Sequence, residues 1–259
     1  MGTVLDVRLV TFNILSGRSL HDNRVDVGRY ADAIRSLDPD VLALQEVDHN
    51  QGRSMNADLT ALAAEAMGAT DHRFVAALTG TPGSTWIAST GEEQPDSAAY
   101  GIALLSRHPV SSWEVVRLPP VPVRVPMWWR GSRLPSWVRD EPRVGVAASV
   151  ETPDGPLTVV NTHLSFLRWW NRRQLRVLLG SLAHRSERLV LVGDLNMEPL
   201  AAHRITGMRP LVSQPTFPAD APTEQIDHVL TRDDLAVSHA GARQLPMSDH
   251  RALVVDLAL

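Results

Sequence analysis

The sequence feature that most constrains the fold is a set of short apolar runs that each end in a polar or titratable residue. One run, residues 189–192, leads into Asp194 and Asn196, which lie two positions apart and so project from the same side of a strand end. Other runs end in the same manner at Asn13, Glu46 and His163. Polar strand ends that converge on one rim are how α/β scaffolds build active sites. The pattern therefore predicts an α/β fold with a polar site at one rim.

Two dipeptides near the C-terminus each place a carboxylate beside an imidazole, Asp227-His228 and Asp249-His250. Because adjacent residues of a strand point to opposite faces, Asp249 and His250 are not expected to pair. Asp227 is expected instead to accept a hydrogen bond from one ring nitrogen of His250, which holds one tautomer of a general base or electrophile. The alternative is a buried hydrogen bond that only ties two strands together.

Hydrophobic periodicity predicts the remaining elements. Helices are expected at residues 24–37, 56–67 and 171–184. Strands are expected at residues 7–13, 41–46, 74–78, 100–106, 112–118, 145–150, 157–163, 189–194, 227–230, 235–240 and 252–257. The strands at 100–106 and 112–118 are interpreted as a pair, those at 145–150 and 157–163 as a hairpin, and residues 79–99 as a loop. Residues 1–259 are expected to form one domain, with a Pro/Trp/Arg-rich irregular excursion at about 117–142.

Composition excludes several classes of protein. The net charge of −4 argues against a protein that coats nucleic acid non-specifically, which needs a broadly basic face. The absence of Cys excludes disulfides, a thiolate nucleophile and a thiolate zinc site. The N-terminus lacks the pattern of a signal peptide, and no run approaches the roughly 18 apolar residues of a membrane span. We therefore expect a cytoplasmic protein without stable membrane insertion, and a monomer.

The motifs resemble, in their order along the chain, those of the endonuclease/exonuclease/phosphatase family. The resemblance extends from Arg8 to the C-terminus and rests on Phe12-Asn13, residues 44–47 (LQEV), residues 100–107 (YGIALLSR), Arg143, residues 161–164 (NTHL), residues 193–196 (GDLN), Ile226-Asp227-His228 and Ser248-Asp249-His250. It implies a four-layer αββα sandwich, in which two mixed sheets pack face to face with helices outside. The family often has an aromatic residue where His228 stands.

A divalent metal site is expected from the same residues. Mg²⁺ takes hard oxygen ligands and keeps several waters, so one or two carboxylates and a neutral oxygen suffice. Glu46 is the first choice of ligand, with Asn13 and Asp249 beside it, directly or through water, and the resemblance supports this set. Mg²⁺ or Mn²⁺ is the expected cofactor.

The resemblance also implies catalytic roles. Asp194 would position or deprotonate the attacking water, and Asn196 would hold the phosphate. The Asp227–His250 pair would act as base or as phosphate ligand, and His163 would donate to a non-bridging oxygen. Tyr100 and Arg143 would be phosphate-side donors, Arg143 through bidentate contact, although Tyr100 could be a core residue and Arg143 a surface charge.

Two segments combine Arg with Trp, residues 117–143 and residues 166–176. One precedes Arg143 and the other follows His163, so both are expected at one edge of the site, where they would set substrate preference. A surface that combines Arg and Trp suits an anionic ligand with a planar or apolar part, either a nucleotide base or a lipid headgroup. The alternative is that these Trp residues pack the excursion onto the sandwich.

The predicted function is divalent-metal-dependent hydrolysis of phosphoester bonds, as a phosphodiesterase acting on a nucleic acid or nucleotide, or on a phospholipid headgroup. Two alternatives remain open. One is a soluble phosphomonoesterase of the inositol-phosphatase type, and the other is a catalytically silent ligand-binding member of the same fold. The sequence does not name the substrate.

Overall fold

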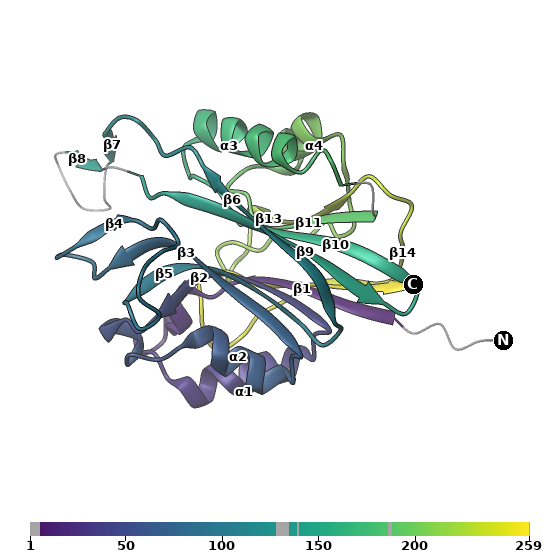
Figure 1. The fold of residues 1–259 in the computed structure, drawn as a ribbon, viewed down its shortest axis with the longest axis horizontal. Coiled ribbons are helices and arrows are strands. Elements are labelled where there is room, and N and C mark those ends of the chain that lie inside the picture. The colour runs from purple at the N-terminus through teal and green to yellow at the C-terminus, as the bar shows by residue number, and fades with distance from the viewer. Residues whose placement is uncertain (1–5, 128–134, 139, 186–187, 259) are drawn as a thin grey trace.

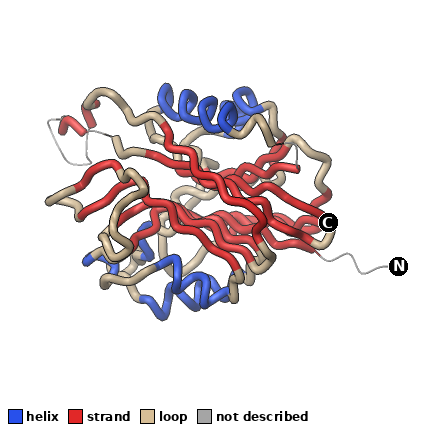
Figure 2. The backbone as a smooth tube through the Cα atoms, viewed as in Figure 1, coloured by secondary structure: helices blue, strands red, loops and turns tan. Residues whose placement is uncertain are grey.

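The computed structural model describes residues 6–127, 135–138, 140–185 and 188–258. In this part of the chain two large mixed sheets pack face to face (Figures 1 and 2). The first sheet has the order β14-β15-β1-β2-β5-β3-β4, with β1 Asp6–Asn13, β2 Val41–His49, β3 Asp71–Gly80, β4 Trp86–Ala88, β5 Ala99–Ser106, β14 Ala236–Arg243 and β15 Ala252–Ala258. The second has the order β12-β13-β11-β10-β9-β6, with β6 Val110–Leu118, β9 Arg143–Thr152, β10 Gly155–His163, β11 Arg188–Asp194, β12 Arg209–Pro210 and β13 Asp227–Thr231.

Helices cover the outer face of each sheet (Figure 1). α1 Val27–Leu37 and α2 Leu59–Met67 lie on the first sheet, and α3 Arg168–Ser181 and α4 Pro199–Thr206 lie on the second. Short 3-10 turns occur at Leu15–Gly17 and Gly52–Ser54. The layers are therefore helix, sheet, sheet, helix, and the expected four-layer αββα sandwich is confirmed. None of the described helices has the length and apolar character needed to span a membrane.

Alternation along the central strands produces the three hydrophobic layers. In β2, Val41 and Ala43 point into the core between the sheets, whereas Leu42 and Leu44 point toward α1 and α2. A strand buried on both faces reads as a continuous apolar run in the sequence. Since β2 pairs parallel with β1, and β10 pairs parallel with β11, the polar ends of these strands are brought to the same side of the sandwich.

Helix boundaries differ from the predictions for identifiable reasons. Asp26 accepts a hydrogen bond from Arg29 N, and Asp58 accepts from two backbone amides, so α1 and α2 begin later than residues 24 and 56. The helix expected at 171–184 begins earlier, at Arg168, and ends at Ser181. α4 was not predicted, although Pro199 in its first turn is a helix-start signal.

Two predictions about strands are wrong. Residues 100–106 and 112–118 do not form a pair, because β5 lies between β2 and β3 whereas β6 pairs with β9 in the other sheet. Residues 79–99 are not all loop, since β4 pairs with the end of β3. The hairpin of β9 and β10 is confirmed.

The excursion before Arg143 is partly regular. β7 Val125–Met127 and β8 Ser136–Val138 form a small antiparallel sheet of their own, at the left of Figure 1. Trp128 and Trp129, with Arg130 and Arg133, lie outside the described residues. The expectation that residues 1–259 form one domain stays a prediction.

Candidate active site

Strand ends from both sheets meet at one rim. In the second sheet, His163 of β10 lies opposite Asp194 of β11, and Asp194 lies opposite Asp227 of β13. In the first sheet, Asn13 ends β1. The amide of Asn13 then joins the two sheets, because Nδ2 donates to Glu46 Oε1 at 3.0 Å and to Asp194 Oδ2 at 3.1 Å. The predicted convergence of polar strand ends is confirmed for Asn13, His163 and Asp194. The expectation that a strand ends at Glu46 is wrong, because β2 continues to His49.

A bulge in β2 carries Glu46. The register between β2 and β5 shifts between Gln45 and Val47, and Glu46 has a φ of 55°. Asn196, at the end of the loop after β11, also has a positive φ, of 49°. Left-handed backbone is costly for a residue with a Cβ, and such strain gathers at functional sites. The bulge re-aims the Glu46 carboxylate, and no feature of the sequence indicates it.

Glu46 and Asp249 provide the carboxylates of a candidate metal site. Burial raises the pKa of Glu46, the Asn13 hydrogen bond opposes this, and the nearby charge of Asp249 raises it further. Asp249 Oδ1 is buried and has no hydrogen-bond partner among the described residues. Asn13 Oδ1 accepts from Leu15 N at 3.2 Å and keeps a second lone pair. An unpaired buried oxygen beside a second carboxylate and an amide oxygen fits the ligand chemistry of Mg²⁺.

A second group with metal-ligand chemistry lies nearby. One ligand atom from each of Asp194, Asp227 and His250 lies within 4.8 Å of the others. Here, however, the side chains bond to one another, with His250 Nδ1 2.8 Å from Asp227 Oδ2. The set also includes a nitrogen, whereas Mg²⁺ prefers oxygen. The pair of Glu46 and Asp249 therefore fits Mg²⁺ better.

The contact predicted between Asp227 and His250 is confirmed. Asp227 Oδ2 accepts from His250 Nδ1 and also from Thr216 Oγ1, and both partners of the pair are buried. Burial disfavours a charged imidazole, but the charge and hydrogen bond of Asp227 outweigh it and raise the pKa of His250 to about 10. His250 is therefore an imidazolium at neutral pH, with Nε2 3.9 Å from Asp194 Oδ2.

Asp194 lies at the centre of the rim. Its Oδ1 accepts from Asn196 N at 2.9 Å, and its Oδ2 is 3.5 Å from His163 Nε2. Burial raises the pKa of Asp194 to about 7, and the charge of Asp227 adds to the shift while His250 opposes it. A carboxylate held between two imidazoles is well placed to orient a water molecule.

Arg143 fixes the tautomer of His163. Arg143 Nη1 is 3.0 Å from His163 Nδ1, and because a guanidinium only donates, Nδ1 must be the acceptor. The ring proton therefore lies on Nε2 and faces the acceptor Asp194 Oδ2 at 3.5 Å. The Asn196 Nδ2 donor, 3.3 Å from the same nitrogen, has the Leu164 carbonyl as its acceptor. Burial and the charge of Arg143 hold the pKa of His163 well below its usual value. His163 is thus a neutral donor.

Arg143 and Tyr100 are both buried at the base of the site. Arg143 is 7% exposed, so the alternative that it is a surface charge is wrong. Its Nη2 lies 3.4 Å from Asp140 and 3.6 Å from Glu141, and its Nε has no partner within the described part of the chain. The Arg53 guanidinium lies over the Tyr100 ring, with Cζ 5.4 Å from the ring centroid. Burial raises the pKa of Tyr100.

These side chains surround a cavity of about 430 Å³. Seven of the residues predicted for the site line it, namely Glu46, Tyr100, Arg143, His163, Asp194, Asn196 and His250. Asn13, Asp227 and Asp249 are not among its lining residues. Asn13 and Asp227 contact the lining residues through hydrogen bonds. The sequence-based prediction missed other lining residues, namely Glu141, Met197, Glu198, Phe217, Glu224 and Ile226. Ile226 belongs to the Ile226-Asp227-His228 motif, and Glu141 lies in the Arg/Trp segment before Arg143. The other four belong to no motif that would have indicated them.

The two Arg/Trp segments meet beside this cavity. Trp170 is buried and its Nε1 donates to the Pro119 carbonyl at 2.9 Å, so it packs one segment onto the other. Trp169 is 54% exposed. Phe166 and Arg168 line the cavity, but Arg168 is paired with Glu198 at 2.9 Å. The expected juxtaposition is confirmed, whereas any role in substrate preference stays a prediction.

Comparisons with known proteins agree with this arrangement. The model of the Endonuclease/Exonuclease/phosphatase family matches residues 10–250. No curated protein sequence matches the chain. An endonuclease/exonuclease/phosphatase from Beutenbergia cavernae is 25% identical, with a TM-score of 0.73 over 98% of this chain and 72% of that one. A mannosyl-6-phosphatase from Bacteroides thetaiotaomicron (14% identity, TM-score 0.63, 98% and 100% covered) and a truncated TDP2 from Caenorhabditis elegans (17%, 0.60, 98% and 98%) share the fold.

Proposed function

The chain belongs to the endonuclease/exonuclease/phosphatase family, and on that premise we propose that it is a divalent-metal-dependent hydrolase of phosphoester bonds. One observation carries the proposal. The Asn13 amide bonds both Glu46 and Asp194, and so holds a candidate metal ligand of one sheet against a candidate catalytic carboxylate of the other. A site that depends on the contact between two sheets in this way fits a catalyst better than a strand-end cap.

Asn13, Glu46 and Asp249 would hold Mg²⁺ or Mn²⁺. When bound, the ion supplies Lewis-acid neutralisation of the phosphoryl oxygens. The fit rests on the unpaired buried Oδ1 of Asp249 and on an all-oxygen donor set.

The remaining residues would bind the phosphate and activate water. Arg143, His163 and His250 present N–H groups to the cavity, and a phosphoryl group accepts from all three kinds of donor. Tyr100 adds a hydroxyl, and Asn196 adds its amide. Asp194 orients the attacking water and accepts its proton. Asp227 positions His250 through the hydrogen bond to Nδ1.

Chelation provides the test of this function. Purified protein should hydrolyse bis-p-nitrophenyl phosphate or p-nitrophenyl phosphate, lose the activity with EDTA, and regain it with Mg²⁺ or Mn²⁺. Failure to hydrolyse either ester with any divalent metal would support the alternative of a catalytically silent ligand-binding member. Comparison of the two esters separates phosphodiesterase from phosphomonoesterase activity.

The charge at the mouth favours one substrate class over another. Glu198 and Glu224 line the cavity together with the aromatic rings of Phe166 and Phe217. Carboxylates repel the phosphates that flank a scissile bond in a nucleic acid, but they accept hydrogen bonds from alcohol groups. A compact phosphoester of an uncharged alcohol therefore suits this mouth better than a polynucleotide. The structural neighbour named a mannosyl-6-phosphatase agrees with such a substrate.

A further inference from the structure

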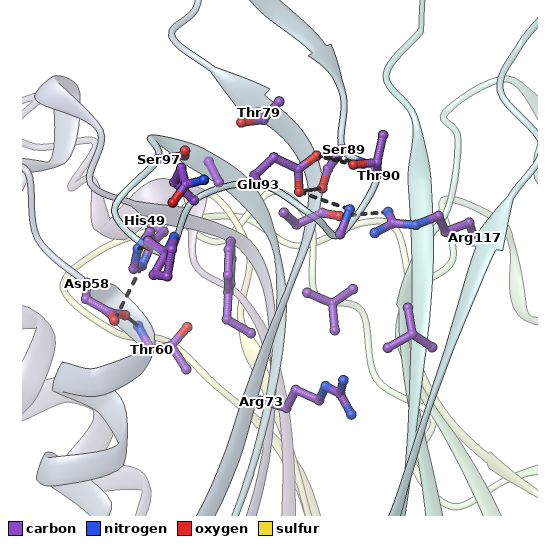
Figure 3. Close-up of a pocket in the computed structure, with 18 of the residues that line it drawn as sticks. His49, Asp58, Thr60, Arg73, Thr79, Ser89, Thr90, Glu93, Ser97 and Arg117 are labelled. Carbon is purple, nitrogen blue, oxygen red and sulfur yellow. Dashed lines mark hydrogen bonds and ion pairs between the residues drawn. The ribbon is translucent and has the colours of Figure 1, made fainter.

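A larger cavity, of about 880 Å³, opens at the free edge of the sandwich and shares no lining residue with the candidate active site. We call it the edge pocket. Its lining comes from α2 and the end of β2, from β3, which lies next to the short edge strand β4, from residues 89–97, and from the edge strand β6 of the other sheet (Figure 3). The volume is that of a small-molecule pocket.

Two arginines without an acidic partner in the described residues, Arg73 and Arg117, line the edge pocket. Arg73 of β3 makes no hydrogen bond or ion pair within the described residues, nor does its neighbour His72. Arg117 of β6 donates one bond, from Nη1 to the Ala76 carbonyl. Arg73 lies two residues from Val75, which packs in the core between the sheets, and Arg117 lies two residues from Val115, which packs against the same core. The two guanidinium groups therefore face one gap from two different sheets.

The acids of the edge pocket are already satisfied. Glu93 accepts four hydrogen bonds from Ser89, Thr90 and Gly91. Partial burial opposes its charge, but these bonds outweigh it and lower the pKa of Glu93 to about 2. Asp58 caps α2 with Oδ1 and faces His49 Nδ1 with Oδ2 at 3.4 Å. The charged group without a partner in the described residues is therefore the guanidinium of Arg73.

The wall on the helix side offers both an aromatic surface and an unpaired hydroxyl. The rings of His49 and Phe74 stack with centroids 5.5 Å apart. Thr60 lines the pocket and is only 2% exposed, and its buried Oγ1 has no hydrogen-bond partner in the described residues. A buried hydroxyl of this kind costs free energy unless a water or a ligand satisfies it. Figure 3 shows Thr60 and Asp58 on this wall, and Arg73 and Arg117 toward the other.

We propose that the edge pocket is a second binding site, separate from the candidate active site, for a small organic anion. Its phosphate or carboxylate group lies between Arg73 and Arg117, and its organic part lies against Phe74 and beside Thr60. Gly91 is consistent with this use of Arg117, since a Cβ there would lie 2.6 Å from Nη2 and displace the guanidinium. The site does not depend on the proposed hydrolase activity.

Calorimetry in EDTA tests the proposal with three probes: inorganic phosphate, benzoate and phenylphosphonate, which cannot be hydrolysed. The double variant Arg73→Gln/Arg117→Gln should bind phenylphosphonate at least tenfold more weakly than the wild type. Arg204→Gln, which removes an exposed charge from α4, should not change the binding. Because phosphate and carboxylate share the anion chemistry, the relative affinities of phenylphosphonate and benzoate identify which group is preferred.

A residue-specific measurement keeps the test independent of folding of the variants. In wild-type protein, the side-chain Nε resonances of Arg73 and Arg117, assigned from the single variants, should shift as phenylphosphonate is added. Weaker binding of inorganic phosphate would support the contribution of the aromatic wall. The proposal would be overturned if the wild type and the double variant bound phenylphosphonate equally and neither Arg73 nor Arg117 showed a shift. All of the observed binding would then have to lie at the candidate active site.

Discussion

At the scale of single residues, burial disfavours the charged form of two histidines, and their neighbours drive the two pKa values in opposite directions. Arg143 donates to Nδ1 of His163 and keeps that ring neutral, whereas Asp227 accepts from Nδ1 of His250 and keeps that ring charged. Both rings nevertheless present an Nε2 proton to the cavity. Phosphoryl oxygens accept hydrogen bonds, so the site can bind a phosphate without a change of tautomer.

The first residue-scale prediction concerns the Asp227–His250 pair. His250→Ala and Asp194→Ala should each lower kcat by at least ~10³-fold, since general acid–base groups contribute about 10²–10⁴. Asp227→Asn should cost less, because His250 stays in place with a poorer partner. The measurement is steady-state hydrolysis of a chromogenic phosphoester, with Asp154→Asn, at the turn between β9 and β10, as the control. Equal losses for Asp227→Asn and His250→Ala would give Asp227 a direct role in the reaction.

The second residue-scale prediction concerns the metal. Glu46→Gln should leave the fold intact and remove most of the affinity for Mg²⁺ or Mn²⁺, because it removes one of the two carboxylates at the candidate metal site. Calorimetric titration with Mn²⁺ measures the affinity. The matched control is Glu141→Gln, because Glu141 lines the same cavity but pairs with Arg143. Unchanged affinity in Glu46→Gln would move the ligand role to the Asp194, Asp227 and His250 group.

The sequence motifs indicated most of the candidate catalytic and metal-binding residues, but few of the residues that line the mouth of the cavity. The predicted hydrogen bond between Asp227 and His250 is present. The alternation rule that argued against an Asp249–His250 pair does not apply in the structure, because both residues lie in a bend before β15. Glu198, Phe217 and Glu224 carry no such signal, because they come from loops whose course is set by tertiary packing. Substrate preference therefore depends on the residues that the sequence describes least.

At the scale of elements, local patterns gave the strands but not their partners. β5 is buried along its whole length, which requires a neighbouring strand on each side, and β2 and β3 fill those places. The connection between β5 and β6 is as short as a hairpin loop, yet it passes from one sheet to the other. Sequence pattern shows that a strand is buried, but does not show by which strand, because pairing depends on long-range contacts.

The element-scale prediction concerns the pairing of β1 with β15. Arg8 and Asp256 are opposite in register and form a bidentate ion pair, with distances of 2.7 Å and 3.0 Å. The Arg8 hydrogen bond lowers the pKa of Asp256, so its stabilising effect is complete above the ordinary value of 3.8 and is lost as pH falls through the lower value of the folded state. Asp256→Asn should therefore lower the free energy of unfolding by about 1 kcal/mol at pH 7.

Urea unfolding of the wild type and Asp256→Asn between pH 7 and pH 3 measures this effect. The difference between the two should shrink toward the acid end of the range. In an Arg8→Gln background, Asp256→Asn should cost less, because the partner is already absent. A difference that does not vary with pH would assign the effect to packing and not to charge.

At the scale of the whole molecule, charge is distributed unevenly around the candidate active site. Donors gather at its base, around Arg143, whereas carboxylates line its mouth. The Glu224 side chain makes no hydrogen bond or ion pair in the described residues, and Glu198 neutralises Arg168. The Arg-rich segment after β10 therefore brings less positive charge to the mouth than its sequence indicates. A single phosphate is attracted to the base, and a chain of phosphates meets repulsion at the mouth.

The corresponding prediction compares a compact substrate with a polyanion. Glu198→Gln/Glu224→Gln should raise kcat/KM for a short DNA oligonucleotide by about threefold per charge removed, since exposed charge interactions are worth about 0.2–1 kcal/mol. The same variant should leave p-nitrophenyl phosphate hydrolysis within about twofold of wild type, because neither residue contacts the phosphate at the base. Added salt should narrow the difference between wild type and variant for DNA, since it screens the repulsion. If the variant gains equally on both substrates, or if wild-type hydrolysis of DNA does not respond to salt, the carboxylates shape the mouth without selecting by charge.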